Sequence, residues 1–329
     1  MIVGSQHLNK DLFSSGVEHA PTRRGFGEGL LLAGQADSAV VALCADLTES
    51  TQMQLFHNEF PDRFVEVGIA EQNLVTVASG LAAVGKKPFV SSYAAFSPGR
   101  NWEQIRTTIA LNDQPVVVVG SHAGLSVGPD GATHQMLEDI ALMRVLPNMT
   151  VVVPADIHEA RKATLAAAKL NKPVYIRLAR ERTAVITTEE SPFEVGKAQV
   201  LHEGEDVTII GCGPVLHEAL LAAQALAEGG IRAEVINVAT IKPLDEDTIL
   251  ASVRKTGAVV SVEEGQVIGG LGGAIAELLA EELPAPLSRV GVDDRFGQSG
   301  KVAELWREYG LTVDSIVTSV HTTVKRKAL

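Results

Sequence analysis

The sequence has 329 residues, of which 46% are hydrophobic, 21% are charged and only 4% are aromatic. Its formal net charge of −12, with one basic cluster at residues 325–327, argues against a nucleic-acid partner. Its two cysteines cannot build a disulfide framework or a cysteine-rich metal site, and no apolar run is long enough to span a bilayer. From the cysteine content and the lack of such a run we expect a protein of a reducing, cytoplasmic compartment. From the length we expect two domains, because single hydrophobic cores stop growing before a chain reaches 329 residues.

The first half of the chain alternates Val-rich segments with helical patterns. We expect strands at residues 39–43, 63–67, 116–120, 150–153 and 174–178. Between residues 70 and 84, apolar side chains recur at the spacing of one buried helical face, and Gly85 is expected to end that helix. Such alternation predicts parallel strands that are joined by helical crossovers.

A polar, acidic stretch at residues 187–206 predicts the boundary between two domains, residues 1–188 and 189–329. Beyond it we expect strands at 207–210, 232–236 and 258–262, and helices at 215–227, after Asp245 and after Gly273. A short helix that contains Trp306 and Tyr309 is expected to close the chain. The predicted fold class is thus α/β, with two parallel-sheet domains of which the second is smaller and doubly wound.

Three glycines at residues 270, 272 and 273 lie between an expected strand and an expected helix. Their spacing departs from the dinucleotide-binding fingerprint, because Ile275 stands where the third glycine belongs. We therefore interpret them as sites of close packing between helix and strand, and we do not predict NAD binding.

Glu71 is the first candidate for chemistry. In RFVEVGIAEQN, residues 63–73, a strand ends near Gly68 and a helix begins near Ile69, which places Glu71 in the first helical turn. Ligands of open α/β sheets bind at this carboxyl edge. An alternative stays open, namely that Glu71 has no catalytic role and only complements the dipole of the helix.

The segment HAGLSVGPDGATHQ, residues 122–135, follows the strand at 116–120 and contains several turn residues. His122, Asp130 and His134 are candidates to converge on a polar ligand. Two alternatives remain open at this point, namely three unrelated structural roles and a metal site formed by the two histidines and the aspartate.

These segments together resemble the transketolase family. The shared phrases, in the family's order, are GIAEQN at 68–73, SYAAF at 92–96, SH at 121–122, GPDGATHQ at 128–135 and VVPAD at 152–156, followed by GGLGG at 269–273 and FGQSG at 296–300. The resemblance covers essentially the whole chain. It implies a pyrimidine-binding domain and a transketolase C-terminal domain, that is, the carboxy-terminal section of a split enzyme that uses thiamine diphosphate.

The resemblance implies how this chain would contact the cofactor. The carboxyl group of Glu71 would hold the pyrimidine N1′ atom, favour the imino tautomer and thereby promote formation of the thiazolium ylid. The rings of Tyr93 and Phe96 would stack on the pyrimidine, although plain core packing explains them too. Asp46 matches a family residue close to the cofactor across the subunit interface, where an N-cap or turn role is an equal alternative.

The resemblance also implies a sugar-phosphate site. His122 and His134 match histidines that bind ketose oxygens near the bond being broken, and Asp130 matches an aspartate that recognises the C2 hydroxyl. The far end needs an anion clamp. The residues that match it are Arg23, Ser50 and Arg180.

We therefore expect a subunit that transfers a two-carbon ketol unit between sugar phosphates through an enamine, as in pentose phosphate metabolism. It is expected to be inactive alone, because the diphosphate and Mg²⁺ would be bound by a separate amino-terminal subunit. A heterotetramer or a homodimer of this half is the expected assembly, and no metal site is expected in this chain.

Three alternatives stay open. A deoxyxylulose-phosphate synthase shares some of the motifs but carries an Asp-Arg pair where Ser121 and His122 stand here. The β subunit of an oxo-acid dehydrogenase matches poorly through GPDGATHQ. A non-catalytic regulatory paralogue would have no reason to retain Glu71, the aromatic pair and both histidines.

Overall fold

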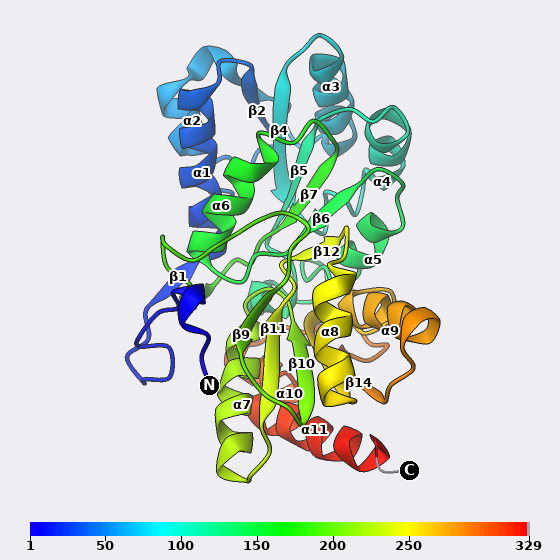
Figure 1. Cartoon of the computed structure of the whole chain (residues 1–329). Coiled ribbons are helices and arrows are strands. Elements are labelled where there is room, and N and C mark those ends of the chain that lie inside the picture. Colours follow the sequence, from blue (N-terminus) through cyan, green and yellow to red (C-terminus); the bar gives the residue numbers. More distant parts are fainter. Residues whose placement is uncertain (328–329) are drawn as a thin grey trace.

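Two mainly parallel β-sheets organise the chain in the computed structural model, which describes residues 1–327 (Figure 1). The first sheet, drawn above the second in Figure 1, is flanked by helices on both sides. Because both of its faces are covered, its central strands are continuously apolar and fully buried. The predicted α/β class with two parallel-sheet units is confirmed.

Seven strands form the first sheet, and all neighbours are parallel except its edge strand β12. Their spatial order is β12 (Thr240–Lys242), β6 (Thr150–Val152), β7 (Val174–Arg177), β5 (Val117–Ser121), β4 (Lys87–Tyr93), β2 (Val40–Cys44) and β3 (Phe64–Glu66). The helices of this unit are α1 (Thr22–Ala36), α2 (Gln54–Glu59), α3 (Glu71–Ala83), α4 (Trp102–Gln104), which continues as a π-helical turn over Ile105–Ala110, α5 (Asp139–Arg144) and α6 (Ile157–Ala167). Short 3-10 turns lie at Gly4–Gln6, Pro61–Arg63 and Leu125–Asp130, and β1 (His19–Pro21) pairs with β8 (Arg182–Ala184).

Five strands form the second sheet, in the order β14 (Leu287–Val292), β13 (Val259–Gln266), β10 (Val207–Gly211), β11 (Ala233–Asn237) and β9 (Gln199–His202), with β9 antiparallel. Its helices are α7 (Leu216–Glu228), α8 (Glu246–Thr256), α9 (Leu271–Glu282), α10 (Val302–Glu308) and α11 (Val313–Lys327). Helix α8 shows why these segments start and stop where they do: the side chain of Asp245 accepts from the Thr248 amide, and Gly257, at φ +66°, ends the helix.

The two units exchange chain segments. Strand β12 follows β11 in the sequence but adds to the edge of the first sheet, beside β6. In the opposite direction, the amino-terminal residue Ile2 pairs with His202 of the second sheet. One hydrophobic cluster contains side chains of α3, α5, α8 and α9 and therefore spans both units. A division of the sequence near residue 188 thus does not separate two independent bodies.

Most predicted elements lie within two or three residues of the observed ones, and three differ. The chain does not end in the short helix with Trp306, because α11 follows it. Strand β9 lies inside the stretch that we interpreted as a linker, and β13 runs four residues past its predicted end. The packing interpretation is confirmed for Gly270 and Gly272, where a Cβ would overlap the Glu263 carboxylate or lie 2.8 Å from the Ser261 hydroxyl oxygen, but not for Gly273, where a Cβ would meet nothing closer than 3.8 Å.

Candidate active site

The predicted site residues lie at one place, the carboxyl edge of the first sheet. Strands β3, β2, β4, β5 and β7 are parallel neighbours, so their carboxyl ends face the same way. The residues at or just beyond these ends are Asp46 after β2, Glu71 after β3, Tyr93 and Phe96 at β4, His122, Asp130 and His134 after β5, and Arg180 after β7. We call residues 122–135 the site loop. Its position is where open parallel sheets bind ligands.

Four rings gather at this edge. The Tyr93 and His122 rings are stacked, with centroids 3.8 Å apart and an interplanar angle of 20°. Phe96 lies 5.8 Å from Tyr93, and His134 lies edge-on 5.4 Å from Phe96. The structure therefore brings together both predicted aromatic residues and both predicted histidines. Flat apolar faces beside imidazole nitrogens suit a ligand that has a ring and polar oxygens.

His122 is buried and adopts a left-handed backbone conformation, at φ +55°. Its Nδ1 lies 2.9 Å from the Ser121 hydroxyl oxygen. Burial, together with the charges of Arg23, Arg180 and His134, lowers the pKa of His122 from 6.5 to about 3. The imidazole is therefore neutral at physiological pH, so one of its nitrogens can donate a hydrogen bond and the other can accept one.

This depressed pKa predicts an acid sensitivity of the fold. The unfolded chain takes up a proton on His122 near pH 6.5, while the folded chain resists protonation down to about pH 3. His122 should therefore make the free energy of unfolding fall by about 1.4 kcal/mol per pH unit as pH drops through this window. His122→Gln should flatten that slope in urea unfolding between pH 4.5 and 6.5. The control His321→Gln, exposed on α11, should not; an unchanged slope in both would contradict the prediction.

Two guanidinium groups lie next to the rings. The Arg23 Nη1 donates to the Ser50 carbonyl oxygen at 2.6 Å, and its Nε donates to the Arg180 carbonyl at 3.2 Å. Ser50 thus contacts Arg23 through its backbone carbonyl. Burial chiefly lowers the pKa of Arg23, and the charge of Arg180 acts in the same direction. Within residues 1–327 both hydrogen bonds of the Arg23 guanidinium go to carbonyl oxygens, whereas the carboxylates of Asp130 and Glu181 pair with Arg180, which favours an external anion at Arg23.

Asp130 belongs to the guanidinium end rather than to the rings. Its carboxylate lies 3.7 Å from Arg180 Nη1, and the same nitrogen donates to the Val127 carbonyl at 2.7 Å. Arg180 therefore ties the site loop to the end of β7. The predicted convergence of His122, Asp130 and His134 is thus divided between two adjoining parts of one site.

Glu71 is the first residue of helix α3, which begins two residues after the predicted start near Ile69, and only 4% of Glu71 is exposed. Both of its carboxylate oxygens lie 3.1–3.2 Å from Nη1 of Arg100, whose guanidinium also covers the Phe96 ring at 4.0 Å. The Asn101 amide donates to the Glu71 carbonyl at 2.7 Å. Sequence reasoning missed Arg100 and Asn101. The only available signal was their place in one turn after SYAAF.

Asp46 lies apart from the rings. Its backbone is left-handed at φ +59°, and its amide donates to the Glu66 carboxylate at 2.8 Å. It lines an open cavity of about 700 Å³ that also includes Ser50, Glu66 and His57. The turn role that we considered for Asp46 is therefore present, and its approach to a cofactor remains a prediction.

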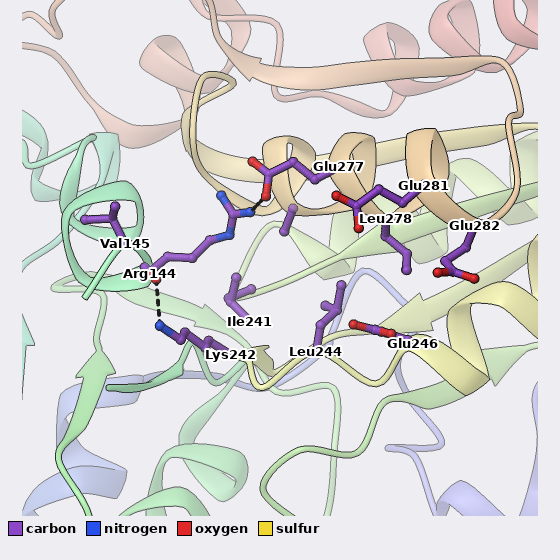
Figure 2. Close-up of a pocket in the computed structure, with 11 residues that line it drawn as sticks. Arg144, Val145, Ile241, Lys242, Leu244, Glu246, Glu277, Leu278, Glu281 and Glu282 are labelled. Atoms are coloured by element: carbon purple, nitrogen blue, oxygen red, sulfur yellow. Dashed lines mark hydrogen bonds and ion pairs between the residues drawn. The ribbon is translucent and has the colours of Figure 1, made fainter. Parts of the chain in front are cut away.

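A second cleft, of about 480 Å³, lies away from these residues where α5, β12 and α9 meet (Figure 2). Arg144 pairs there with Glu277, and Lys242 donates to the Arg144 carbonyl at 3.0 Å. Glu246, Glu281 and Glu282 line the rest of it. None of the predicted site residues reaches this cleft, which belongs to the contact between the two units.

Two features are absent from residues 1–327, a cluster of metal-ligating side chains and a membrane-spanning helix. Among residues 1–327 no group of three or more His, Cys, Asp or Glu side chains could hold a metal ion, so His122, Asp130 and His134 do not form such a group. Across the same range, no helix has the length and apolar character that crossing a membrane requires.

Two family models match the chain in succession. Residues 18–185 match the pyrimidine binding domain of transketolase, and residues 196–316 match the C-terminal domain of transketolase. The chain belongs to the transketolase family.

Within this family the chain is similar to proteins of its own length. It is 46% identical over 308 residues to a Methanocaldococcus jannaschii protein provisionally named a transketolase C-terminal section, covering 93% of this chain and 96% of that one. It is 45% identical over 298 residues, 91% of this chain and 92% of the other, to a 6-deoxy-6-sulfo-D-fructose transketolase subunit of a Clostridium species. A solved structure described as an inactive β4 tetramer of a split-gene transketolase matches with a TM-score of 0.88 at 45% identity, over 93% of this chain and 99% of that one.

Proposed function

We propose that this chain is the carboxy-terminal subunit of a split transketolase, which transfers a two-carbon ketol unit from a ketose phosphate to an aldose phosphate. The observation that carries the proposal is one continuous group of side chains at the carboxyl edge of the first sheet. A buried carboxylate, a set of stacked rings and two guanidinium groups follow one another there. These groups suit a heteroaromatic ring, sugar oxygens and a phosphate, in that order.

The residues present fit the aminopyrimidine end of thiamine diphosphate. Glu71 offers a buried carboxylate at a helix start, and Tyr93 and Phe96 offer ring faces close to it. When bound, this cofactor supplies the carbanion chemistry that breaks and forms the carbon–carbon bond. Glu71 would hold a proton at the pyrimidine N1′ atom, for which Arg100 would have to release its carboxylate. We assign the diphosphate and Mg²⁺ to the amino-terminal subunit.

The remaining residues would bind the sugar. We assign the free ring nitrogen of neutral His122 and the ring of His134 to oxygens near the cleaved bond, and Asp130 to the C2 hydroxyl. A neutral histidine can move a proton between two oxygens without carrying a charge of its own. Arg23 and Arg180, with the backbone of Ser50, would hold the phosphate at the other end, because the Arg23 guanidinium bonds only neutral carbonyl oxygens within residues 1–327 and lies beside Arg180.

The proposed assembly is a heterotetramer of two such chains with two amino-terminal subunits, in the cytoplasm and in pentose phosphate metabolism. The naming of a similar chain as a C-terminal section supports a separate partner, and so does the split-gene structure that is described as an inactive tetramer of β chains. The similarity to a sulfosugar transketolase subunit supports a test of more than one donor.

The experiment is a ketol-transfer assay with xylulose 5-phosphate and ribose 5-phosphate, in the presence of thiamine diphosphate and Mg²⁺. We expect product only when this chain is mixed with its amino-terminal partner, and none from either chain alone. Activity of the lone chain would overturn the assignment of the diphosphate site to a partner. If the mixture is active with 6-deoxy-6-sulfofructose but not with xylulose 5-phosphate, ketol transfer stands as the reaction and the proposed donor is wrong.

A further inference from the structure

We propose that the second unit holds the site loop in its binding conformation through two buried positioning residues, Glu264 and Gln135. The inference rests on the proposed function, because it assigns to the second unit a part in sugar binding. It concerns residues 124–135, which carry Asp130 and His134, and the segments 264–266 and 297–306, which come from the other end of the chain. In this proposal the FGQSG segment, residues 296–300, helps to hold the site loop.

Glu264, at the end of β13, reaches across to the start of the site loop. Its Oε1 accepts from the backbone amide of Ser126 at 2.5 Å and from Trp306 Nε1, on α10, at 3.3 Å. Its own carbonyl accepts from Arg177 Nη2 at 2.7 Å. Burial raises the pKa of the Glu264 carboxyl, against the opposing effect of Arg177. A buried carboxyl group is costly unless it is hydrogen-bonded, so the bonds of Oε1 to Ser126 and Trp306 constrain where Glu264 can lie.

Gln135 fixes the other end of the loop. Its Nε2 lies within hydrogen-bonding distance of three carbonyl oxygens, Leu125 at 3.3 Å, Gly128 at 3.2 Å and Gln298 at 3.0 Å. The first two belong to the 3-10 turn that ends at Asp130, and the third belongs to FGQSG. The side-chain amide of Gln135, the residue after His134, therefore connects the loop to the 3-10 turn and to the second unit. Gln135 is only 5% exposed.

Glycines permit this close approach. A Cβ on Gly124, at φ +82°, would lie 2.7 Å from the Glu264 carboxyl carbon, and one on Gly131, at φ +75°, would lie 2.5 Å from the Ser299 hydroxyl. A Cβ on Gly297 would overlap the Gln135 side-chain oxygen. The loop backbone at Gly124 and Gly131 therefore lies at contact distance from side chains of the second unit, and the Gly297 backbone lies equally close to the Gln135 side chain. A small movement of the second unit must move Asp130 and His134.

The test compares Glu264→Leu, which removes the acceptor, with Glu264→Gln, which retains an oxygen for Ser126 and Trp306. In the full-length chain we expect hydrogen exchange of the Ser126 amide to accelerate about tenfold or more in Glu264→Leu and to stay near wild type in Glu264→Gln. In the reconstituted complex, Glu264→Leu should raise KM for the sugar phosphate about tenfold while exchange of the cofactor's C2 proton is unchanged. Gln135→Met, which removes the amide donor, should likewise raise KM for the sugar phosphate and leave exchange of the cofactor's C2 proton unchanged. This variant replaces Glu264→Leu in the test if Glu264→Leu does not fold.

Glu263 provides a matched control. It precedes Glu264 on β13, is equally buried, and points to the other face, where it accepts from the Leu271 and Gly272 amides at the start of α9. Glu263→Leu should lower stability but leave the Ser126 amide and KM unchanged. Equal effects of the Glu263 and Glu264 variants on KM would overturn the proposal, and so would fast Ser126 exchange with an unchanged KM. If the wild-type complex transfers no ketol unit, the proposed function fails, and amide exchange alone then decides whether Glu264 holds the loop.

Discussion

Replacing Glu71 with alanine in the reconstituted complex is expected to slow exchange of the cofactor's C2 proton about 10²- to 10⁴-fold, the range of a positioned acid–base group. Glu71 is a buried carboxylate that begins a helix at the sheet edge, and Arg100 links it to the Phe96 ring. Assembly of the complex should survive the substitution. Arg100, the ion-pair partner of Glu71, is half exposed, so water can solvate its guanidinium when the carboxylate is lost. The measurement is deuterium exchange at C2 followed by NMR, with assembly checked by sedimentation.

The matched control for this experiment is Glu103→Ala. Glu103 is an exposed carboxylate on α4, three residues beyond Arg100, and its side chain bonds only the adjacent Gln104 amide. Its removal should leave the exchange rate within about twofold of wild type, as for most surface substitutions. An undiminished exchange rate in Glu71→Ala would remove this carboxyl from the chemistry and leave it as a cap of α3.

Replacing Arg23 with glutamine is expected to raise KM for a phosphorylated sugar roughly 10- to 100-fold, because a charged hydrogen bond contributes about 1.5–3 kcal/mol. The Arg23 guanidinium is half-buried beside Arg180, and a phosphate would relieve the repulsion between the two charges. The turnover number should change little, since the phosphate lies away from the reacting bond. Steady-state kinetics with a phosphorylated and an unphosphorylated acceptor separate these effects.

Arg24 offers the comparison residue for Arg23. It is the next residue on α1 and is paired with Glu28 at 2.8 Å on the exposed face of the helix. Arg24→Gln should leave both KM values unchanged. A loss in Arg23→Gln that is equal for phosphorylated and unphosphorylated sugars would contradict the phosphate role and indicate a general disturbance of the Ser50 and Arg180 backbones.

The sequence was informative wherever a local pattern decides the structure. The Val-rich strands and the helix that begins at Glu71 follow from periodicity, and parallel topology then brings the ends of neighbouring strands together. Helix α11 was missed although its buried residues Ile316, Val320 and Thr323 recur at helical spacing, because its many β-branched residues have a low intrinsic helix propensity.

The interactions that hold the site were beyond such patterns. The bond from Ser126 to Glu264 joins residues 138 positions apart, and the contact of Gln135 with Gln298 spans 163. No periodicity reports contacts at that separation, and only the folded chain reveals them. Arg100 is closer in the sequence to its partner Glu71, at 29 positions. An arginine after a turn is nevertheless expected to be a solvated surface residue unless its carboxylate partner is known.

The exchange of segments between the two units bears on how this protein can be divided. Expression of residues 1–188 alone would remove β12 and leave β6 as a bare sheet edge, whose unpaired amides and carbonyls invite association with other chains. The remaining piece would lose the amino-terminal pairing of Ile2 with His202. We therefore expect a cut between the two units to destabilise both of them.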